Sequence, residues 1–457
     1  MQRWVKFARY LSDFGWTPVV VVPEGAAYPV EDVSLSADVP DGMEVIRVPI
    51  WEPFDAAQRL LGAQATEVER LGASAKAGEE KDSVASRLAK WVRGNLFIPD
   101  ARVGWVRPAT KAIVRHLLEK PAAAIITTGP PHSVHLIGQN VQRTMAQRGQ
   151  PIQWIADFRD PWSDIDYLDD FHLTSWARQQ HKKLERQVVN ACDRLLVTAW
   201  GAAAGLLDIS ATEVRKRPDV WWIPNGWDAQ DLPSPFPEAQ APDPETFVLA
   251  HFGSLYASRD FPAVWTAVRD WNLAAATLTD RRKIQLHFWG NTAPEVQASL
   301  RLLLPEEDVV IHGNLPHKQA VAQMAKADAL LLLHNDTASG RKCIPGKLFE
   351  YLAVGRPLLA VGPDPGDLAW IMREEMLRTS PGAPLHFHAP TDGNGLFQTL
   401  GRLVGTTFAD AQLDPAMVGR YERRALTSDL ALRLDELLAS TPKVQMGNPE
   451  RSPSVSP

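Results

Sequence analysis

Short apolar runs alternate with amphipathic segments along almost the whole chain, and this alternation constrains the fold more than any other feature. Such alternation is typical of parallel strands that helices cover on both faces. The expected strands are Pro18–Val22, Glu44–Ile50, Ala123–Thr127, Gln153–Phe158, Arg194–Ala199, Val220–Pro224, Phe247–Phe252, Ile284–Trp289, Val309–His312, Ala329–His334, Pro357–Val361 and Leu385–His388. The sequence therefore predicts an α/β protein with two Rossmann-like, parallel-sheet domains that face each other across a cleft.

The domain boundaries follow from changes in composition. The stretch "DLPSPFPEAQAPDPET", Asp231–Thr246, is rich in proline and acidic residues and predicts an interdomain linker. It separates a first domain, residues 1–230, from a second domain, residues 247–405, and C-terminal helices are expected over residues 406–440. A segment rich in Ala, Glu and Lys, residues 61–86, is expected to be a mobile surface insertion. The tail, residues 441–457, has little to bury and is expected to be disordered.

The overall charge excludes one class of partner. The chain has 48 Lys and Arg residues against 54 Asp and Glu residues, a formal net charge of −6, which is not the basic footprint of a nucleic-acid-binding protein.

Cys192 and Cys343 are far apart in sequence, so neither a disulfide framework nor a zinc motif is indicated. No apolar run is long enough to span a membrane, and no signal peptide opens the chain. These features predict a cytoplasmic enzyme or binding protein.

Polar residues follow the strands of the second domain, where ligands bind in parallel sheets. Gly253 and Ser254 could let a phosphate approach backbone N–H groups, and Arg259 could pair with it. In "IPGKLFEYLAVGRPLLAVG", Ile344 to Gly362, Pro345 is expected at the first helical position, so that Lys347 and Glu350 fall in the opening turns. A cation there opposes the helix dipole unless an anion is nearby. That anion could be a bound diphosphate, in which case Glu350 would accept hydrogen bonds from the ribose hydroxyls. Alternatively, the anion is Glu350 itself, in an i,i+3 salt bridge with Lys347.

Five segments together resemble a known family. They are "ADFRDPWSD", "IPNGWD", "FGSLYASRD", "GNLPH" and "PGKLFEYLAVGRPLL". In combination and order they resemble a family 4-type glycosyltransferase of the GT-B fold, with the group 1 glycosyl transferase domain and its subfamily 4-like N-terminal domain, over the chain up to about Leu437. The resemblance implies that the second domain binds a nucleotide sugar through Gly253, Ser254, Arg259, Gly313, Asn314, Leu315, Pro316, Gly346, Lys347 and Glu350.

Within that set the resemblance assigns separate roles. Arg259 and Lys347 match the cations that bind the diphosphate, Glu350 matches the acid that binds the ribose, and the loop from Gly313 to Pro316 matches the one that borders the base. The family often has a second glutamate eight positions before the ribose acid. Lys342 stands there in this chain, so the contacts to the sugar on that side differ.

In the first domain the resemblance places polar residues beside the reacting centre, at the ends of the strands. The catalytic candidates are Asp157, Arg159, Asp160 and His132. For Asp160, which precedes a proline, a turn or helix cap is an equally good interpretation. For His132, a helix-start residue with a satisfied ring is slightly favoured. Asn225 and Gly226 are more consistent with a turn that closes a strand than with a ligand contact.

These inferences predict transfer of a sugar from a nucleotide diphosphate-sugar to a glycan or lipid-linked acceptor. The resemblance implies retention at the anomeric carbon, a place in glycan or surface polysaccharide biosynthesis, and no metal or other cofactor, because cations and helix N-termini would stabilise the leaving diphosphate. Two alternatives stay open. One is a nucleotide-sugar epimerase on the same fold, and the other is an inactive nucleotide-binding or partner protein.

The start of the chain raises its own expectation. Similar proteins begin with a strand and a glycine-rich loop, whereas this chain begins on a helix, Gln2–Ser12, so we expect that the usual first strand of the N-terminal domain is missing. Trp4, Phe7 and Leu11 alternate with basic residues in that helix. This pattern is interpreted as a core-facing helix, with peripheral contact to anionic lipid on the cytoplasmic face of a membrane as the alternative.

Overall fold

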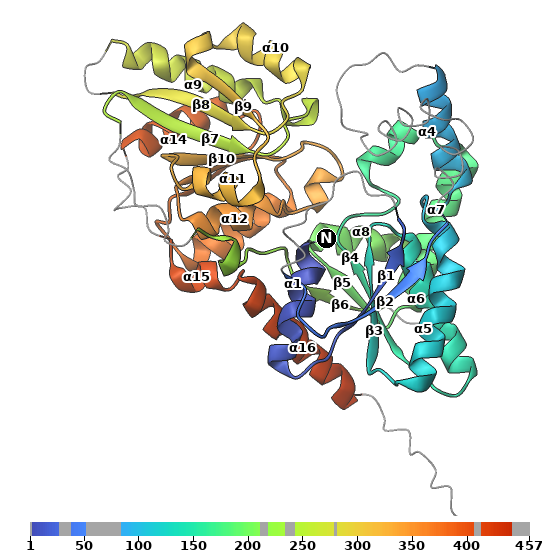
Figure 1. The fold of residues 1–457 in the computed structure, drawn as a ribbon. Helices are drawn as coiled ribbons and strands as arrows, with labels where there is room; N and C mark the ends of the chain where they lie inside the picture. The colour runs from blue at the N-terminus through green and yellow to red at the C-terminus, as the bar shows by residue number, and fades with distance from the viewer. Residues whose placement is uncertain are drawn as a thin grey trace, which may run out of the picture.

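The computed structural model describes residues 2–26, 38–51, 84–210, 218–233, 243–277, 281–405 and 413–440. Figure 1 shows two α/β domains, one on each side of a central junction. The second half of the chain builds one of them around a six-stranded parallel sheet, and the first half builds the other around parallel strands as well. The predicted fold class is therefore confirmed.

The sheet of the second domain has the strand order β12-β11-β10-β7-β8-β9. Its strands are β7 (Thr246–Phe252), β8 (Lys283–Trp289), β9 (Val309–Gly313), β10 (Ala329–Leu333), β11 (Leu358–Val361) and β12 (Leu385–His388). Because side chains alternate along a strand, Leu330 and Leu332 of β10 pack into one core, whereas Leu331 and Leu333 pack into the other. Each face of the sheet is thus buried.

Helices cover those two faces. The helices of this domain are α9 (Pro262–Ala275), α10 (Pro294–Leu303), α11 (His317–Met324), α12 (Lys347–Val354), α13 (Asp367–Trp370), α14 (Gly393–Gly405) and α15 (Pro415–Gly419). One core is formed with the buried sides of α9, α10 and α14. The core on the opposite face of the sheet is formed with the buried sides of α11, α12 and α15. Helix α12 starts at Lys347 with Gly346 as its N-cap residue, so the prediction that Pro345 takes the first helical position was wrong by two residues.

The strands of the first domain form two separate parallel sheets. One has the order β3-β4-β5-β6, and the other pairs β1 with β2. The strands are β1 (Val19–Glu24), β2 (Glu44–Pro49), β3 (Ala124–Gly129), β4 (Gln153–Phe158), β5 (Arg194–Val197) and β6 (Asp219–Trp222). No described strand pairs with β1 on one side or with β3 on the other to join the two sheets.

Five helices of this domain surround its strands (Figure 1). They are α4 (Val84–Leu96), α5 (Val106–Glu119), α6 (Ser133–Gln147), α7 (Ser175–Ala191) and α8 (Trp200–Ser210). Residues 61–83 of the predicted insertion lie outside the described residues, and residues 84–86 belong to α4. The predicted tail, residues 441–457, and residues 234–242 of the predicted linker also lie outside them.

The first and last helices pack against each other on the first domain. Phe7 of α1 (Gln2–Tyr10) and Leu11, in the short 3-10 helix that follows it, share a core with Leu430 and Leu434 of α16 (Arg423–Ser440). α1 is therefore the predicted core-facing helix. Arg3 and Lys6 of α1 are only 3% and 2% exposed. These two cations contact protein rather than solvent, and the lipid-contact alternative for this helix is not supported.

The chain crosses between the domains twice, and the two crossings are bonded together. Trp227 N–H donates to Tyr421 C=O (3.1 Å), and Arg423 N–H donates to Trp227 C=O (2.7 Å). A Cβ atom on Gly226 would lie 2.3 Å from Tyr421 O, so only glycine allows this approach. In the described part of the chain, no helix is long and apolar enough to span a bilayer.

Candidate active site

The sheet of the second domain reverses its strand order between β7 and β10, and ligands bind at such switch points. These strands pair only at Ala329 with Leu249 and at Leu330 with Ala250, and then they diverge. Where the strands separate, side chains bond the backbone groups that no longer pair between β7 and β10. Phe252 N–H donates to the Tyr351 hydroxyl (2.8 Å), and the His251 ring bonds through Nδ1 to Leu331 C=O (2.9 Å). The crevice between the strands is therefore filled by the buried side chains of Tyr351 and His251, and its backbone polar groups stay satisfied.

Arg259 spans this crevice. It follows β7, and its Nη1 donates to Ser254 C=O (2.9 Å) on the same side. Its Nε donates to the Asn335 side chain, which follows β10 on the other side. The guanidinium is thus held over the switch point, where the sequence placed a diphosphate-binding cation. This position agrees with the prediction for Arg259 but does not test it.

Gly253 joins the loops that follow β7 and β8. Its N–H donates to Trp289 C=O (2.7 Å), so this donor is not available to a phosphate. Its φ of +132° favours glycine, and a Cβ on the facing Gly290 would lie 2.3 Å from Gly253 O. The two glycines let the loops after β7 and β8 pack directly on each other. Gly253 also lies beside Lys347, so its predicted role, to let a phosphate approach the backbone there, stays a prediction.

Glu350 lies between two cationic side chains. Lys347 Nζ donates to its Oε2 (3.1 Å), so the i,i+3 salt bridge considered from the sequence is present. His317 Nε2 donates to its Oε1 (3.3 Å). Burial raises the pKa of this carboxyl, but the His317 hydrogen bond and the Lys347 charge outweigh burial and lower the pKa to about 2. The same hydrogen bond raises the pKa of His317.

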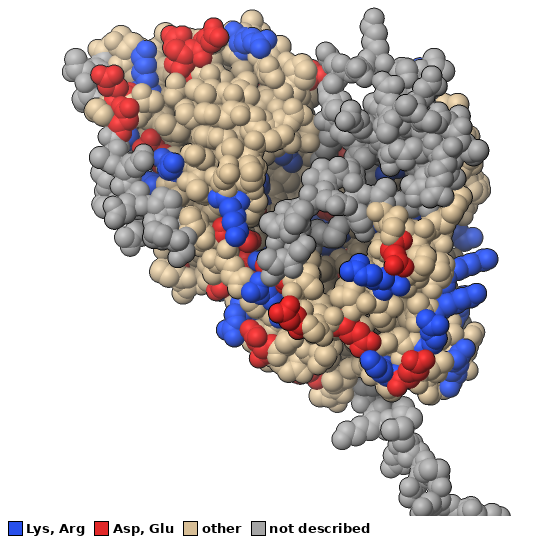
Figure 2. Space-filling model, in the orientation of Figure 1, with Lys and Arg blue, Asp and Glu red and all other residues tan. Residues whose placement is uncertain are grey.

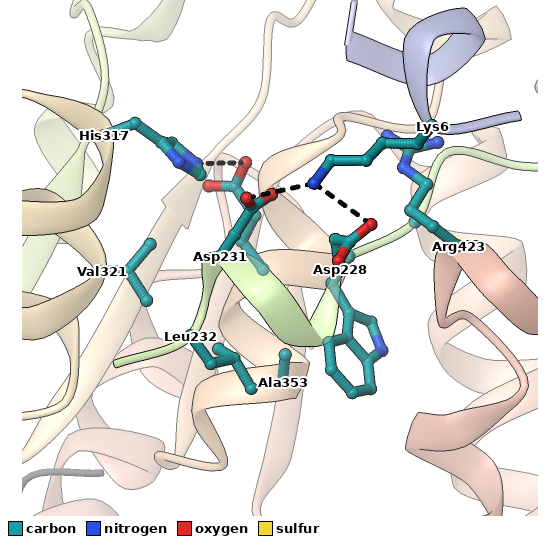
Figure 3. Close-up of a pocket in the computed structure, with 11 residues that line it drawn as sticks. Lys6, Asp228, Asp231, Leu232, His317, Val321, Ala353 and Arg423 are labelled. Atoms are coloured by element: carbon teal, nitrogen blue, oxygen red, sulfur yellow. Dashed lines mark hydrogen bonds and ion pairs between the residues drawn. The ribbon is translucent and has the colours of Figure 1, made fainter. Parts of the chain in front are cut away.

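A pocket adjoins Glu350 at the junction of the domains. Figure 3 shows Lys6, Asp228, Asp231, His317 and Arg423 around it. Lys6 of α1 pairs with Asp228 (3.3 Å) and Asp231 (3.4 Å), which belong to the first crossing segment. The pocket is therefore lined by both domains and by both crossings, and its walls carry charges of both signs.

The predicted base-binding loop lies next to this pocket. Gly313 has a φ of +76°, which favours glycine. Asn314 and Pro316 are exposed and Leu315 is half-buried. Pro316 is the N-cap residue of α11, whose first residue is His317. The loop is thus open to a ligand and continues directly into the side chain that bonds Glu350.

Two of the four catalytic candidates in the first domain serve its own structure. Asp157 is fully buried, accepts hydrogen bonds from Thr128 Oγ1 (2.7 Å) and Trp4 Nε1, and lies 3.9 Å from the Arg3 guanidinium. Arg159 donates to Gly129 C=O (3.1 Å) and to Pro130 C=O. Because α1 covers Asp157, this carboxylate does not contact a substrate in this arrangement.

His132 and Asp160 lie closer to the cleft. His132 is the N-cap residue of α6, is 4% exposed, and stacks on Trp162 with ring centroids 4.9 Å apart. Its ring nitrogens make no hydrogen bond of good geometry with a described residue, but the Pro161 backbone lies close enough to raise the pKa of the ring slightly, so the expectation of a satisfied ring stays a prediction. Burial lowers its pKa well below the usual value, with nearby His135 and Arg159 adding to the effect. Asp160 is half-buried and acts electrostatically on Cys343 of the other domain.

The loops that border the cleft touch across it. Lys342, at the position of the family's second glutamate, pairs with Asp164 (3.0 Å). Thr337 Oγ1 donates to Asp166 (2.7 Å), and Gly201 N–H donates to Asp367 (2.7 Å). Asp164 and Asp166 therefore bind the opposite domain. Within the described residues no cluster of three or more His, Cys, Asp and Glu side chains could hold a metal ion.

Sequence reasoning missed several residues of the site. His317 is part of the quoted motif "GNLPH", but its partner Glu350 is 33 positions away. Three further residues were missed because no sequence pattern indicated that β7 and β10 diverge. Where the strands separate, hydrogen bonds are formed by the side chains of Asn335, Tyr351 and His251. A polar residue directly after a buried strand, such as Asn335, is the signal that could have been used.

Comparison with known proteins supports the fold. No sequence-family model and no curated protein matches the chain. A sucrose-phosphate synthase structure from Thermosynechococcus elongatus matches with a TM-score of 0.55 and 12% identity, covering 95% of this chain and 92% of that one. An α,α-trehalose 6-phosphate synthase from Burkholderia multivorans matches with a TM-score of 0.54 and 13% identity, covering 95% of this chain and 92% of that one.

A third solved structure extends the comparison. The UDP-forming trehalose-phosphate synthase from Burkholderia xenovorans, in complex with glucose-6-phosphate, has a TM-score of 0.51 and 12% identity over 94% of each chain. These similarities show that the chain has the GT-B fold. At such identity they show the fold alone, and the assignment to family 4 stays a prediction.

Proposed function

We propose that this chain is a glycosyltransferase that moves a sugar from a nucleoside diphosphate sugar to an acceptor, with retention at the anomeric carbon. The observation that carries the proposal is the placement of Lys347, Glu350 and Arg259 around the switch point of the second sheet. A diphosphate there would draw Lys347 away from Glu350 and would lie near the N-terminus of α12. Glu350 would then accept hydrogen bonds from the two ribose hydroxyls.

The chemistry follows from the charges that meet the leaving group. Departure of the nucleoside diphosphate leaves negative charge beside Lys347, Arg259 and the α12 N-terminus, which stabilise it without reorganisation. We assign no carboxylate pair for double displacement. Asp160 is the candidate of the first domain that faces the other domain, and His132 lies beneath the same loop. In this proposal Asp157 and Arg159 position that loop.

The acceptor is proposed only by class. The trehalose-phosphate synthase structure from Burkholderia xenovorans is a complex with glucose-6-phosphate. A sugar phosphate is therefore a sensible first acceptor to test, beside glycan and lipid-linked acceptors of surface polysaccharide synthesis. In this proposal the reaction needs no metal, because protein cations surround the diphosphate.

The test is a donor screen followed by product analysis. Thermal shift with uridine, guanosine and adenosine diphosphates should identify the base, because a ligand that binds only the folded state stabilises it. Mass spectrometry with the matching donor sugar and acceptors should then detect a product heavier than the acceptor by one sugar. We expect activity in saturating chelator to stay within a factor of a few of the untreated enzyme.

The outcomes separate this function from its alternatives. Release of free nucleoside diphosphate with no glycosylated product would favour an epimerase. Nucleotide binding without turnover would favour an inactive binding protein. Failure of every nucleotide to bind would contradict the donor site itself.

A further inference from the structure

The helices on the outer side of the first domain are strongly basic, although the whole chain has a net charge of −6. α4 has no acidic residue, and α5 has one, at its end. The single acid of α7, Glu185, is buried against Ser163. The basic residues of these helices are Arg87, Lys90, Arg93, Arg107, Lys111, Arg115, Arg178, Lys182, Lys183 and Arg186. In the other domain α9 and α10 each balance one arginine with one acid.

These cations are presented to solvent on one side. Arg107, Lys111 and Arg115 recur every fourth residue of α5 and are all exposed, as are Lys182 and Lys183 of α7. None of these five forms an ion pair with a described carboxylate. Figure 2 shows Lys and Arg side chains projecting along the edge of the molecule where α5 lies in Figure 1.

Large apolar side chains are exposed beside the cations. Leu88 and Leu96 of α4 are 60% and 64% exposed, Trp91 is 39% exposed, and Trp176 at the start of α7 is 60% exposed. The end of α4 is fixed to the start of α7, because Thr174 N–H donates to the Asn95 side chain (2.7 Å). The apolar residues therefore gather at one corner, where water contact is unfavourable unless a partner covers them.

That corner is joined to the acceptor side of the cleft. Asp100, just after α4, accepts hydrogen bonds from the N–H and the hydroxyl of Ser133 (2.8 Å each), the residue next to His132. His181 of α7 bonds Trp162, on which His132 stacks. α4 and α7 thus meet the loops at the carboxyl ends of β3 and β4.

We propose that the outer face of α4, α5 and α7 docks on an anionic lipid bilayer, so that the acceptor side of the cleft opens at the membrane surface. Exposed Trp and Leu side chains among Lys and Arg residues are the pattern of an interfacial helix, with the apolar groups entering the headgroup region and the cations facing anionic lipid. The buried Arg3 and Lys6 of α1 take no part. A nucleic acid would also attract the cations, but it gives no reason for Leu88 and Leu96 to be exposed.

The experiment is sedimentation of the full chain with vesicles of phosphatidylcholine, alone or mixed with phosphatidylglycerol. We expect binding to the mixed vesicles that weakens as salt rises, and much weaker binding to the neutral ones. Trp91→Ser with Trp176→Ser, and separately Lys182→Glu with Lys183→Glu, should each lower the apparent affinity about tenfold or more. Leu302→Ser with Arg301→Glu, at exposed positions of α10, is the matched control and should bind like wild type.

Three results would overturn the proposal. They are no binding to anionic vesicles, equal loss in the control variant, or tight binding to single-stranded RNA that the Lys182 and Lys183 changes abolish while vesicle binding persists. Circular dichroism melts of each variant verify that its fold is retained. No sugar donor is present in the assay, so it succeeds or fails separately from the transfer reaction.

Discussion

The two domains share an architecture but use the ends of their strands differently. In the second domain the strands at the switch point diverge, and Arg259, Lys347 and Glu350 are held there by a few hydrogen bonds. In the first domain Asp157 is the second-to-last residue of β4 and Arg159 directly follows the strand, yet they bond to α1 and to the end of β3. Polar residues at the ends of strands in two similar sheets are thus half-buried and proposed to bind a ligand in one case, and serve the fold in the other.

The difference teaches that a polar residue after a parallel strand is not sufficient evidence of a ligand site. What decides is whether another element covers the strand end. α1 covers the end of β4, because Trp4 Nε1 donates to Asp157. Arg3 also donates to Ile223 C=O (2.8 Å) and Pro224 C=O, just after β6, and these bonds fix the helix in place. Four measurements, from the largest expected effect to the smallest, can break or sharpen this comparison.

Asp157→Ala should destabilise the first domain by about 3–5 kcal/mol, because it leaves the buried Arg3 guanidinium without its counter-charge. Asp157→Asn, which keeps the hydrogen-bond geometry, should lose less. Urea unfolding of the two variants measures the difference. A fully stable Asp157→Ala protein that has lost only transfer activity would instead place this carboxylate in the chemistry and break the comparison.

Glu350→Ala should weaken binding of the nucleoside diphosphate by about 1.5–3 kcal/mol, because it removes a charged acceptor of hydrogen bonds. Lys347→Ala should also weaken it, and neither change should alter the fold, since both side chains are partly exposed. Isothermal titration calorimetry measures the affinity. Lys326→Ala, an exposed cation of the same domain, is the control, and unchanged affinity in both site variants would rule out the donor site.

His317 should make donor binding depend on pH. Its pKa is raised by the Glu350 hydrogen bond, so the imidazolium is present at acidic pH and is lost as pH rises through this raised value. Lys347 opposes that charge, whereas Asp231 and Glu350 favour it. Loss of the positive charge on His317 should therefore lower the affinity for a nucleotide sugar by up to about fivefold as pH rises. This decrease corresponds to the free energy of an accessible ion pair, about 0.2–1 kcal/mol.

The matched variants isolate this effect. Binding to His317→Asn should lack the pH dependence, whereas Lys318→Gln, the adjacent exposed cation, should keep it. Titrations across neutral pH with one donor compare the three proteins. If His317→Asn follows the wild-type curve, another group titrates and His317 does not orient Glu350.

The cross-cleft pair of Lys342 and Asp164 should contribute least. Both side chains are about one-third exposed, so their coupling should be about 0.2–1 kcal/mol. A double-mutant cycle with Lys342→Ala and Asp164→Ala, followed by urea unfolding, gives this coupling directly. A coupling well above that range would mean that the interface between the domains is as strong as a domain core.

The sequence predicted the strands well because their apolar runs are nearly continuous. Gln153–Phe158 and Leu385–His388 have the predicted bounds, since each run is followed at once by a loop or turn. The start of α12 was harder to predict. Pro345 satisfies the rule for a first helical position, yet the loop that brings Gly346 near Asn225 delays the helix by two residues.

The candidate site was predicted in part for a physical reason. Lys347 and Glu350 are three positions apart on one helix, so their contact follows from helix geometry. The bonds from Asp157 to Trp4 and from His317 to Glu350 depend on packing between segments far apart in sequence. Local patterns carry no information about such contacts, which is why the buried role of Asp157 and the position of His317 emerged only from the fold.

The double crossing between the domains has a mechanical consequence. A single connecting strand would let one domain swing and twist freely about it, but two crossings bonded at Trp227, Tyr421 and Arg423 resist twisting. We expect any motion between the domains to be a rotation about one axis near these residues. Displacement in a rotation grows with distance from its axis, so the pocket lined by Asp228 and Arg423 keeps its shape while more distant loops separate. A ligand seated there would remain bound while the two domains rotated about this axis.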